Sequence, residues 1–78
     1  MVTLYDFELS AECYQVRLFL ALNRISYETQ PVDIFPGRDQ DEDWFRRMSP
    51  EGRLPVLVDG PNTIAGALGV LRYLAAPV

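Results

Sequence analysis

A strand, a helix and a second strand follow one another within the first 30 residues, and this order constrains the fold more than any other feature of the sequence. Val2-Thr3-Leu4-Tyr5 alternates in polarity and is rich in β-forming residues. Ser10 is a favoured helix N-cap, and apolar residues recur at helical spacing from Ala11 to Asn23. Tyr27-Glu28-Thr29-Gln30 again has a period of two. A helical crossover between two strands of one sheet is right-handed, so these strands should form a parallel pair.

The middle of the chain predicts a loop and a short helix. Phe35-Pro36-Gly37-Arg38 has the composition of a turn, and Ile34 to Gln40 is the loosest stretch of the sequence. Asp41-Glu42-Asp43 is typical of an acidic first helical turn, and the helix should run to Met48. We expect the loop to be mobile and to lie on the ligand-binding side of the fold.

The last third predicts a hairpin followed by a helix. The apolar strand Pro55-Val56-Leu57-Val58 and the short strand Thr63-Ile64 flank the turn residues Asp59-Gly60-Pro61-Asn62. Leucines at helical spacing then indicate a helix from Gly66 to about Ala75. The complete order, βαβαββα, predicts a thioredoxin-like α/β fold with a mixed four-stranded sheet and helices on both faces.

Composition indicates a single domain and excludes several classes of partner. The 78 residues are 49% apolar, enough for one modest core, so residues 1–78 should form one domain. No apolar run approaches the roughly 18 residues of a membrane span, and the N-terminus does not resemble a signal peptide, so we expect a cytoplasmic protein without membrane contact. The net charge of −4 makes nucleic acid an improbable partner.

The sequence also limits the available chemistry. It contains no His, no Lys and a single Cys, so we expect no metal site and none of the usual general bases or Schiff-base formers. Hydroxyl, thiol and backbone groups remain. Ser10 and Cys13 have the spacing of a redox Cys-x-x-Cys motif, with Ser in place of the first cysteine. Because Cys13 is the single cysteine, dithiol exchange within one chain is excluded. The choice for Cys13 lies between a buried structural thiol, which we favour, and a redox thiol.

Two features together suggest a binding site for a small anionic thiol peptide. A proline at the entry of a strand lies on an edge or adopts the cis form, which would turn the backbone of Leu54, before Pro55, outward to receive an extended peptide. The helix that begins after Ser10 offers unpaired N–H groups and a partial positive charge, which stabilise a thiolate or carboxylate.

The whole chain resembles the N-terminal domain of the cytosolic glutathione transferases. The resemblance rests on three blocks, which are Leu4-Tyr5 leading to the segment from Ser10 to Leu18, the segment from Ser49 to Leu57, and Leu71-Arg72-Tyr73-Leu74. It implies that Leu54, before a cis Pro55, pairs its backbone with the cysteinyl part of glutathione, and that Ser10 activates the thiol. Glutathione would be the co-substrate.

Two departures from the family accompany the resemblance. The family has an acidic residue followed by Ser at the start of the last helix, where they hold the γ-glutamyl end of glutathione, whereas this chain has Gly66-Ala67. The resemblance implies that Gly66 and Ala67 bind glutathione at this position, where only the backbone N–H groups of the helix start remain. Each lost charge-assisted hydrogen bond is worth roughly 1.5–3 kcal/mol, so the affinity could fall by about two orders of magnitude. We also expect residues 1–78 to lack the C-terminal helical domain that supplies most of the electrophile pocket in the family.

Two candidate site residues each have a plainer alternative role. The Ser10 hydroxyl could stabilise a glutathione thiolate, or it could simply cap the helix. The Arg53 guanidinium could bind the glycyl carboxylate of glutathione, or it could pair with Glu51 or Asp59 on the surface.

Two functions from different classes follow from these observations. The first is a glutathione transferase-like domain that presents glutathione to an electrophile, with Ser10 stabilising the thiolate, although Glu8 and Glu12 would oppose that negative charge. The second is a non-catalytic binding or assembly module that has lost strong glutathione binding because of Gly66-Ala67. Such a module would bind a protein partner, or a second copy of itself, through the face that a helical domain would cover.

Overall fold

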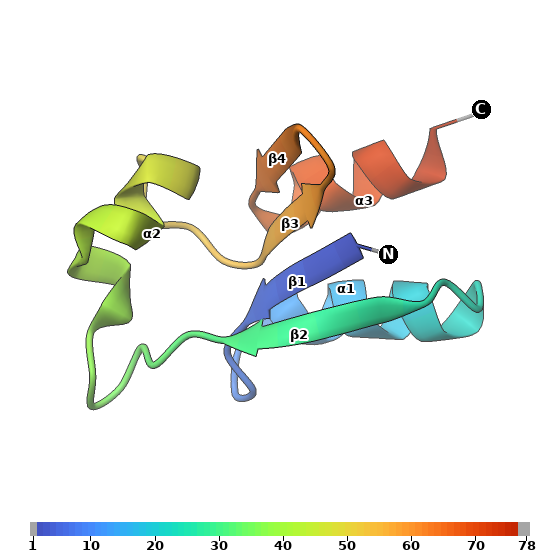
Figure 1. The fold of residues 1–78 in the computed structure, drawn as a ribbon. Coiled ribbons are helices and arrows are strands. Elements are labelled where there is room, and N and C mark those ends of the chain that lie inside the picture. Colours follow the sequence, from blue (N-terminus) through green and yellow to red (C-terminus); the bar gives the residue numbers. More distant parts are fainter. Residues whose placement is uncertain (1, 77–78) are drawn as a thin grey trace.

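The computed structural model describes residues 2–76 and contains one mixed sheet of four strands in the order β2-β1-β3-β4 (Figure 1). The strands are β1 (Val2–Asp6), β2 (Tyr27–Pro31), β3 (Val56–Asp59) and β4 (Asn62–Ala65). β1 is parallel to β2 and antiparallel to β3, and β3 is antiparallel to β4. The predicted parallel pair and hairpin are therefore both present, and the thioredoxin-like fold class is confirmed.

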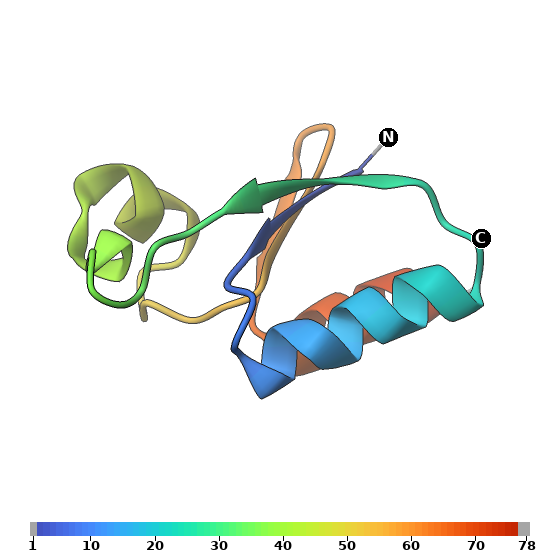
Figure 2. The ribbon, with the colours of Figure 1, turned by 90° about the horizontal axis from the view of Figure 1, so that it is seen from below.

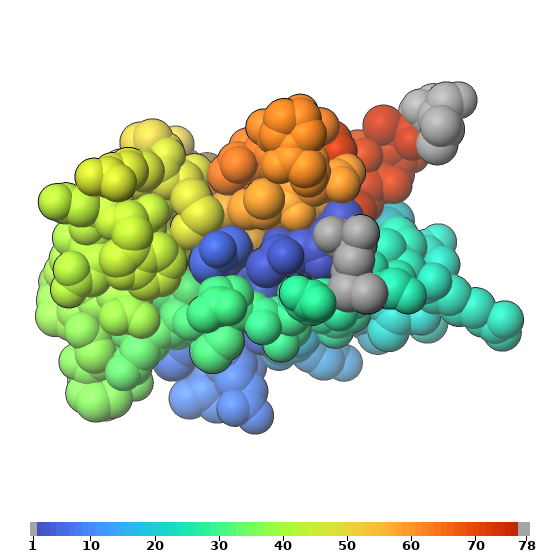
Figure 3. Space-filling view, viewed as in Figure 1, coloured from blue at the N-terminus to red at the C-terminus, as the bar shows by residue number. Residues whose placement is uncertain are grey.

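Helices lie on both faces of the sheet. Figure 2 shows α1 (Ala11–Leu22) and α3 (Ala67–Ala75) side by side along one face. The short 3-10 helix η1 (Asp39–Asp41) and α2 (Asp43–Met48) lie towards one end of the molecule, and α2 packs on the opposite face. Side chains of β1 are visible between β2 and the hairpin in Figure 3, so α2 covers only part of that second face.

The main core fills the space between the sheet and the two long helices. Leu4 and Leu57 are opposite each other in the register of β1 and β3, and both are fully buried. They belong to one cluster with four residues of the helices, which are Val16, Leu20, Ala67 and Val70. The helical spacing of these apolar residues therefore places one stripe of α1 and of α3 against the same face of the sheet.

A smaller core lies on the other face of the sheet. Phe45 of α2 is fully buried and packs with Val56 and Val32. Val56 precedes Leu57 in β3, so its side chain points to the face opposite the main core. Trp44 contacts the edge of the Phe45 ring, with ring centroids 5.8 Å apart, and remains partly exposed. Phe45 therefore holds α2 against this face of the sheet.

The predicted helix from Asp41 to Met48 is wrong at its start. Asp41 ends η1, and Glu42 has extended backbone angles of φ −76° and ψ 147° before α2 begins at Asp43. The Asp39 carboxylate accepts a hydrogen bond from the backbone N–H of Asp33 at 2.8 Å. This bond ties η1 to the preceding loop, and the extended backbone at Glu42 separates η1 from α2 along the chain.

The hairpin also differs slightly from its predicted limits. Pro55 precedes β3, which begins at Val56, because proline has no N–H to donate to the ladder. Asp59 pairs with Asn62, so that only Gly60 and Pro61 form the connection. None of the helices within residues 2–76 combines the length and the apolar character that crossing a membrane would require.

A polar contact joins the hairpin to α3. The Tyr73 hydroxyl donates to the Asp59 carboxylate at 2.5 Å and accepts from the Asn62 side-chain amide at 3.2 Å. The neighbouring Asp59 carboxylate raises the pKa of the Tyr73 hydroxyl above its usual value, because the hydrogen bond favours the protonated form.

We expect Tyr73→Phe to lower the free energy of unfolding, since the hydrogen bonds with the Asp59 carboxylate and the Asn62 amide are lost. Urea denaturation followed by circular dichroism measures this change. Tyr14→Phe is the matched control, because Tyr14 is exposed on α1 and its ring lies 5.9 Å from the Arg17 guanidinium. Equal effects of the two substitutions would contradict a role for the Tyr73 hydroxyl.

Candidate functional site

A cavity of about 450 Å³ opens between the start of α1 and the segment that leads into β3. It has a mixed polar and apolar lining, made of Phe7, Ser10, Glu12, Ile34, Gln40, Gly52, Arg53 and Leu54. Three of the predicted site residues, Ser10, Arg53 and Leu54, are therefore brought together. The predicted loop from Ile34 to Gln40 contributes both of its end residues to the same cavity.

Ser10 is the N-cap of α1. Its Oγ accepts a hydrogen bond from the Cys13 backbone N–H at 3.2 Å, and its own backbone N–H donates to the Phe7 carbonyl at 3.0 Å. Accepting this bond leaves the hydroxyl proton of Ser10 free to donate into the cavity. The capping role and the thiolate-stabilising role use different parts of one hydroxyl and are therefore compatible.

The loop between β1 and α1 is fixed by Arg17. The Arg17 guanidinium forms an ion pair with Asp6 at the end of β1 and donates to the Glu8 carbonyl at 3.1 Å. Both side chains of the ion pair are largely shielded from solvent, so the contact is better protected from screening than a surface pair. Arg17 thereby sets the position of the loop that carries Phe7 and leads to Ser10.

Cys13 lies in the first turn of α1, and its backbone N–H donates to the Ser10 hydroxyl. It is fully buried and has no disulfide partner. Burial raises the pKa of the Cys13 thiol above its usual value, which disfavours the thiolate near neutral pH. The prediction that Cys13 is buried is confirmed, and its structural role stays a prediction.

Leu54 presents its backbone to the cavity. The peptide bond between Leu54 and Pro55 is cis, and the Pro55 side chain is fully buried beneath it. Among residues 2–76, the Leu54 N–H and C=O have no hydrogen-bond partner. The half-buried backbone of Leu54 therefore keeps a donor and an acceptor for an extended ligand.

The turn before Leu54 is held by Ser49, which is almost fully buried. The Ser49 Oγ accepts from the Arg53 backbone N–H, and the Ser49 carbonyl accepts from the Gly52 N–H, both at 2.8 Å. Gly52 has φ +72°, a conformation that L side chains rarely adopt. These contacts fix the direction in which Arg53 and Leu54 leave the turn.

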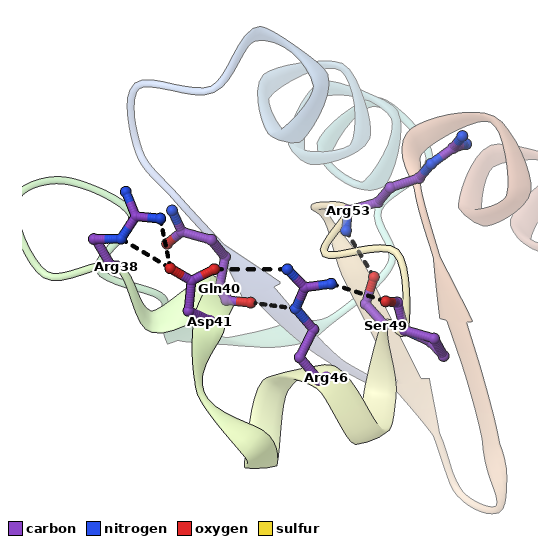
Figure 4. Close-up of polar contacts among 7 residues, drawn as sticks. Arg38, Gln40, Asp41, Arg46, Ser49 and Arg53 are labelled. Atoms are coloured by element: carbon purple, nitrogen blue, oxygen red, sulfur yellow. Dashed lines mark hydrogen bonds and ion pairs between the residues drawn. The ribbon is translucent and has the colours of Figure 1, made fainter.

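Arg46 joins this turn to the opposite wall of the cavity, as Figure 4 shows. Its guanidinium donates to the Gln40 carbonyl at 2.8 Å and to the Pro50 carbonyl at 2.9 Å, and it lies 3.6 Å from the Asp41 carboxylate. The sequence analysis did not identify Arg46, because contacts of a side chain with distant carbonyls have no local sequence signal.

Gln40 lines the cavity and was not predicted as a site residue. Its Oε1 is shielded from solvent and, within residues 2–76, has no hydrogen-bond partner. An unpaired buried acceptor is costly, so a donor of a ligand at this wall would be favoured. The one sequence signal for Gln40 was its place at the end of the loop from Ile34 to Gln40, which was expected on the ligand-binding side of the fold.

Gly66 and Ala67 do not line the cavity, although both were predicted to bind the ligand. Both residues are buried, and the Gly66 N–H donates to the Pro55 carbonyl at 2.8 Å. That N–H is therefore engaged by the protein itself. Gly66 also has φ +89° and ψ 143°, a combination that is almost restricted to glycine.

The Arg53 side chain reaches from the cavity to Gly66. Its Cδ lies 3.6 Å from the position that a Cβ on Gly66 would occupy. Figure 4 shows the guanidinium turned away from the Arg46 contacts. Arg53 pairs with Glu51 at 3.7 Å, as one alternative proposed, but both side chains are mostly exposed and such pairs contribute little.

Comparison with known proteins identifies the family. Residues 4–77 match the model of the glutathione S-transferase N-terminal domain. A relative, glutathione S-transferase 1 of Dianthus caryophyllus, is 38% identical over 71 residues, which are 91% of this chain and 32% of that protein. The chain belongs to the glutathione S-transferase family and spans about a third of the length of this relative.

Solved structures agree with this assignment. Glutathione transferase E6 from Drosophila melanogaster has a TM-score of 0.89 and 30% identity, with 95% of this chain and 33% of that chain covered. A glutathione transferase homolog from Drosophila mojavensis with bound glutathione has a TM-score of 0.88 and 26% identity, with 94% and 33% covered.

We expect Gly66→Ala to destabilise the protein by about 1–3 kcal/mol, the usual cost of a strained backbone conformation. The nearest atom to the added Cβ would be Arg53 Cδ at 3.6 Å, so steric overlap is not the cause. Thermal or urea denaturation measures the loss. An unchanged free energy of unfolding would contradict the assignment of this position to glycine on conformational grounds.

Proposed function

We propose that this chain is the glutathione-binding domain of a glutathione transferase-like enzyme and stabilises the glutathione thiolate for attack on an electrophile. The observation that carries the proposal is the placement of the free Leu54 backbone and the Ser10 hydroxyl in one cavity. The family assignment supports glutathione as the co-substrate.

The proposed binding mode begins with the cysteinyl part of glutathione. Its backbone pairs with the N–H and C=O of Leu54 in the manner of an added strand, for which buried Pro55 provides a fixed support. Gln40 and the apolar side chains of Phe7 and Ile34 form the surrounding walls. In this arrangement the thiol is directed towards the start of α1.

Ser10 then acts on the thiol. Its hydroxyl donates a hydrogen bond to the sulfur, while the bond from the Cys13 N–H holds the oxygen in place. Donation to the thiolate, together with the positive end of α1, lowers the thiol pKa. No general base is needed once that pKa approaches about 7, because the thiolate then exists at neutral pH. Glu12 lines the cavity and opposes this effect with its negative charge.

A second candidate function is a non-catalytic binding module. It is favoured by the absence of polar side chains at Gly66 and Ala67 and by apolar residues exposed on the two long helices. These residues are Tyr14, Leu18 and Leu22 of α1 and Leu68 of α3. In this case a protein partner covers the helices and the cavity is not used.

Titration with reduced glutathione, followed by amide chemical shifts, separates the two functions. We expect saturable shifts at Ser10, Leu54 and Gln40 at or below about millimolar glutathione, which corresponds to roughly 4 kcal/mol of binding free energy. The absence of shifts at several millimolar would favour the binding module and contradict the transferase proposal.

Ser10→Ala should raise the pKa of bound glutathione and reduce its conjugation to a small electrophile, with little loss of affinity. It should also lower the free energy of unfolding by about 1 kcal/mol through loss of the N-cap. The ultraviolet absorbance of the thiolate, recorded against pH, measures the pKa directly. Ser26→Ala is the matched control, since Ser26 is exposed and does not line the cavity. An unchanged thiol pKa in Ser10→Ala would leave Ser10 with the capping role alone.

A further inference from the structure

The cavity carries a positive charge, that of Arg53, at its end near Gly66. Arg53 lines the cavity and lies alongside Gly66, whereas neither Gly66 nor Ala67 carries a polar side chain. The exposed pairing of Arg53 with Glu51 at 3.7 Å is weak, so the guanidinium can turn to a ligand. A guanidinium has only donors and matches a carboxylate.

The same end offers little to an ammonium group. An ammonium group has three donors and needs acceptors, preferably a carboxylate. The Pro55 carbonyl near Gly66 is already bonded to the Gly66 N–H, and Arg53 would repel a second positive charge. A ligand end with a carboxylate and no ammonium group fits these neighbours better than a free amino acid end.

We propose that the site prefers thiol peptides whose end near Gly66 carries a carboxylate without an adjacent ammonium group, and that Arg53 determines this specificity. The inference rests on the proposed function, and it takes the γ-glutamyl end of the bound peptide to lie beside Arg53 near Gly66, where the family resemblance places that end. Arg53 thus recognises the γ-glutamyl carboxylate, and not the glycyl carboxylate that the sequence suggested.

Glu12 is the acidic residue among those that line the cavity. It lies in the first turn of α1, two residues after Ser10, and so belongs to the wall where the thiol is proposed to lie. Arg53 instead reaches the start of α3 at Gly66. Glu12 is therefore assigned to the surroundings of the thiol, and its substitution provides a direct test of that assignment.

Three ligands of equal backbone length test the proposal by isothermal titration. They are reduced glutathione, glutaryl-cysteinyl-glycine, which lacks the ammonium group, and 4-aminobutanoyl-cysteinyl-glycine, which lacks the γ-glutamyl carboxylate. We expect the glutaryl peptide to bind at least as tightly as glutathione and the aminobutanoyl peptide to bind about 10-fold or more weakly, as for the loss of a charge-assisted hydrogen bond.

Substitutions identify the residue responsible. Arg53→Gln should weaken glutathione and the glutaryl peptide by about 10-fold or more and leave the aminobutanoyl peptide nearly unaffected. Arg47→Gln is the matched control, since Arg47 is exposed on α2 and does not line the cavity. It should change none of the three affinities appreciably.

Several results would overturn the inference. One is binding of glutathione about 10-fold tighter than the glutaryl peptide, particularly if Glu12→Gln abolishes that difference, because Glu12 would then hold the ammonium group. Another is glutathione binding that Arg53→Gln does not weaken, which removes the specificity role and leaves the proposed function intact. Failure of all three ligands to bind at several millimolar would overturn the proposed function together with the inference.

Discussion

Side chains along β1 and β3 point alternately to the two faces of the sheet, and both packing layers depend on this alternation. Leu4 and Leu57 face α1 and α3, while Tyr5 and Val56 face α2. A shift of one residue in the pairing of these strands would exchange the two sets and expose both cores. Because β1 lies between β2 and β3, it also sets where the β1–α1 loop and the turn before β3 meet. The cavity forms at that meeting point.

The cavity is lined mainly by loops, and side chains that do not line it hold those loops in place. Arg17 ties the β1–α1 loop to Asp6, Ser49 shapes the turn before Leu54, and Arg46 connects that turn to Gln40. Each of these contacts satisfies a backbone group or a charge that would otherwise be exposed or unpaired. The cavity-lining residues Ser10 and Leu54 are therefore held in position by the protein itself, and such preorganisation reduces the ordering cost of binding.

Gly66 shows how a backbone conformation limits the side chains that one position can carry. Its φ of +89° strongly favours glycine, so an acidic side chain at this position would be held only at a conformational cost. Arg53 lies next to it and brings a positive charge to the same place. The chain thus keeps the scaffold of a glutathione transferase N-terminal domain while presenting a different distribution of charge at one end of the site.

The sequence by itself determined the order of the elements, since periods of two and of 3.6 residues, caps and turn residues are local signals. It also identified Ser10, Arg53 and Leu54 as neighbours, through the resemblance of the Ser10 and Ser49 to Leu57 blocks to a known family. Only the tertiary structure decided the rest. The break at Glu42, the Arg46 contacts, the unpaired Gln40 Oε1 and the reach of Arg53 to Gly66 join residues from separate segments. Contacts of this kind depend on how the folded chain brings distant segments together, so they cannot be predicted from local periodicity.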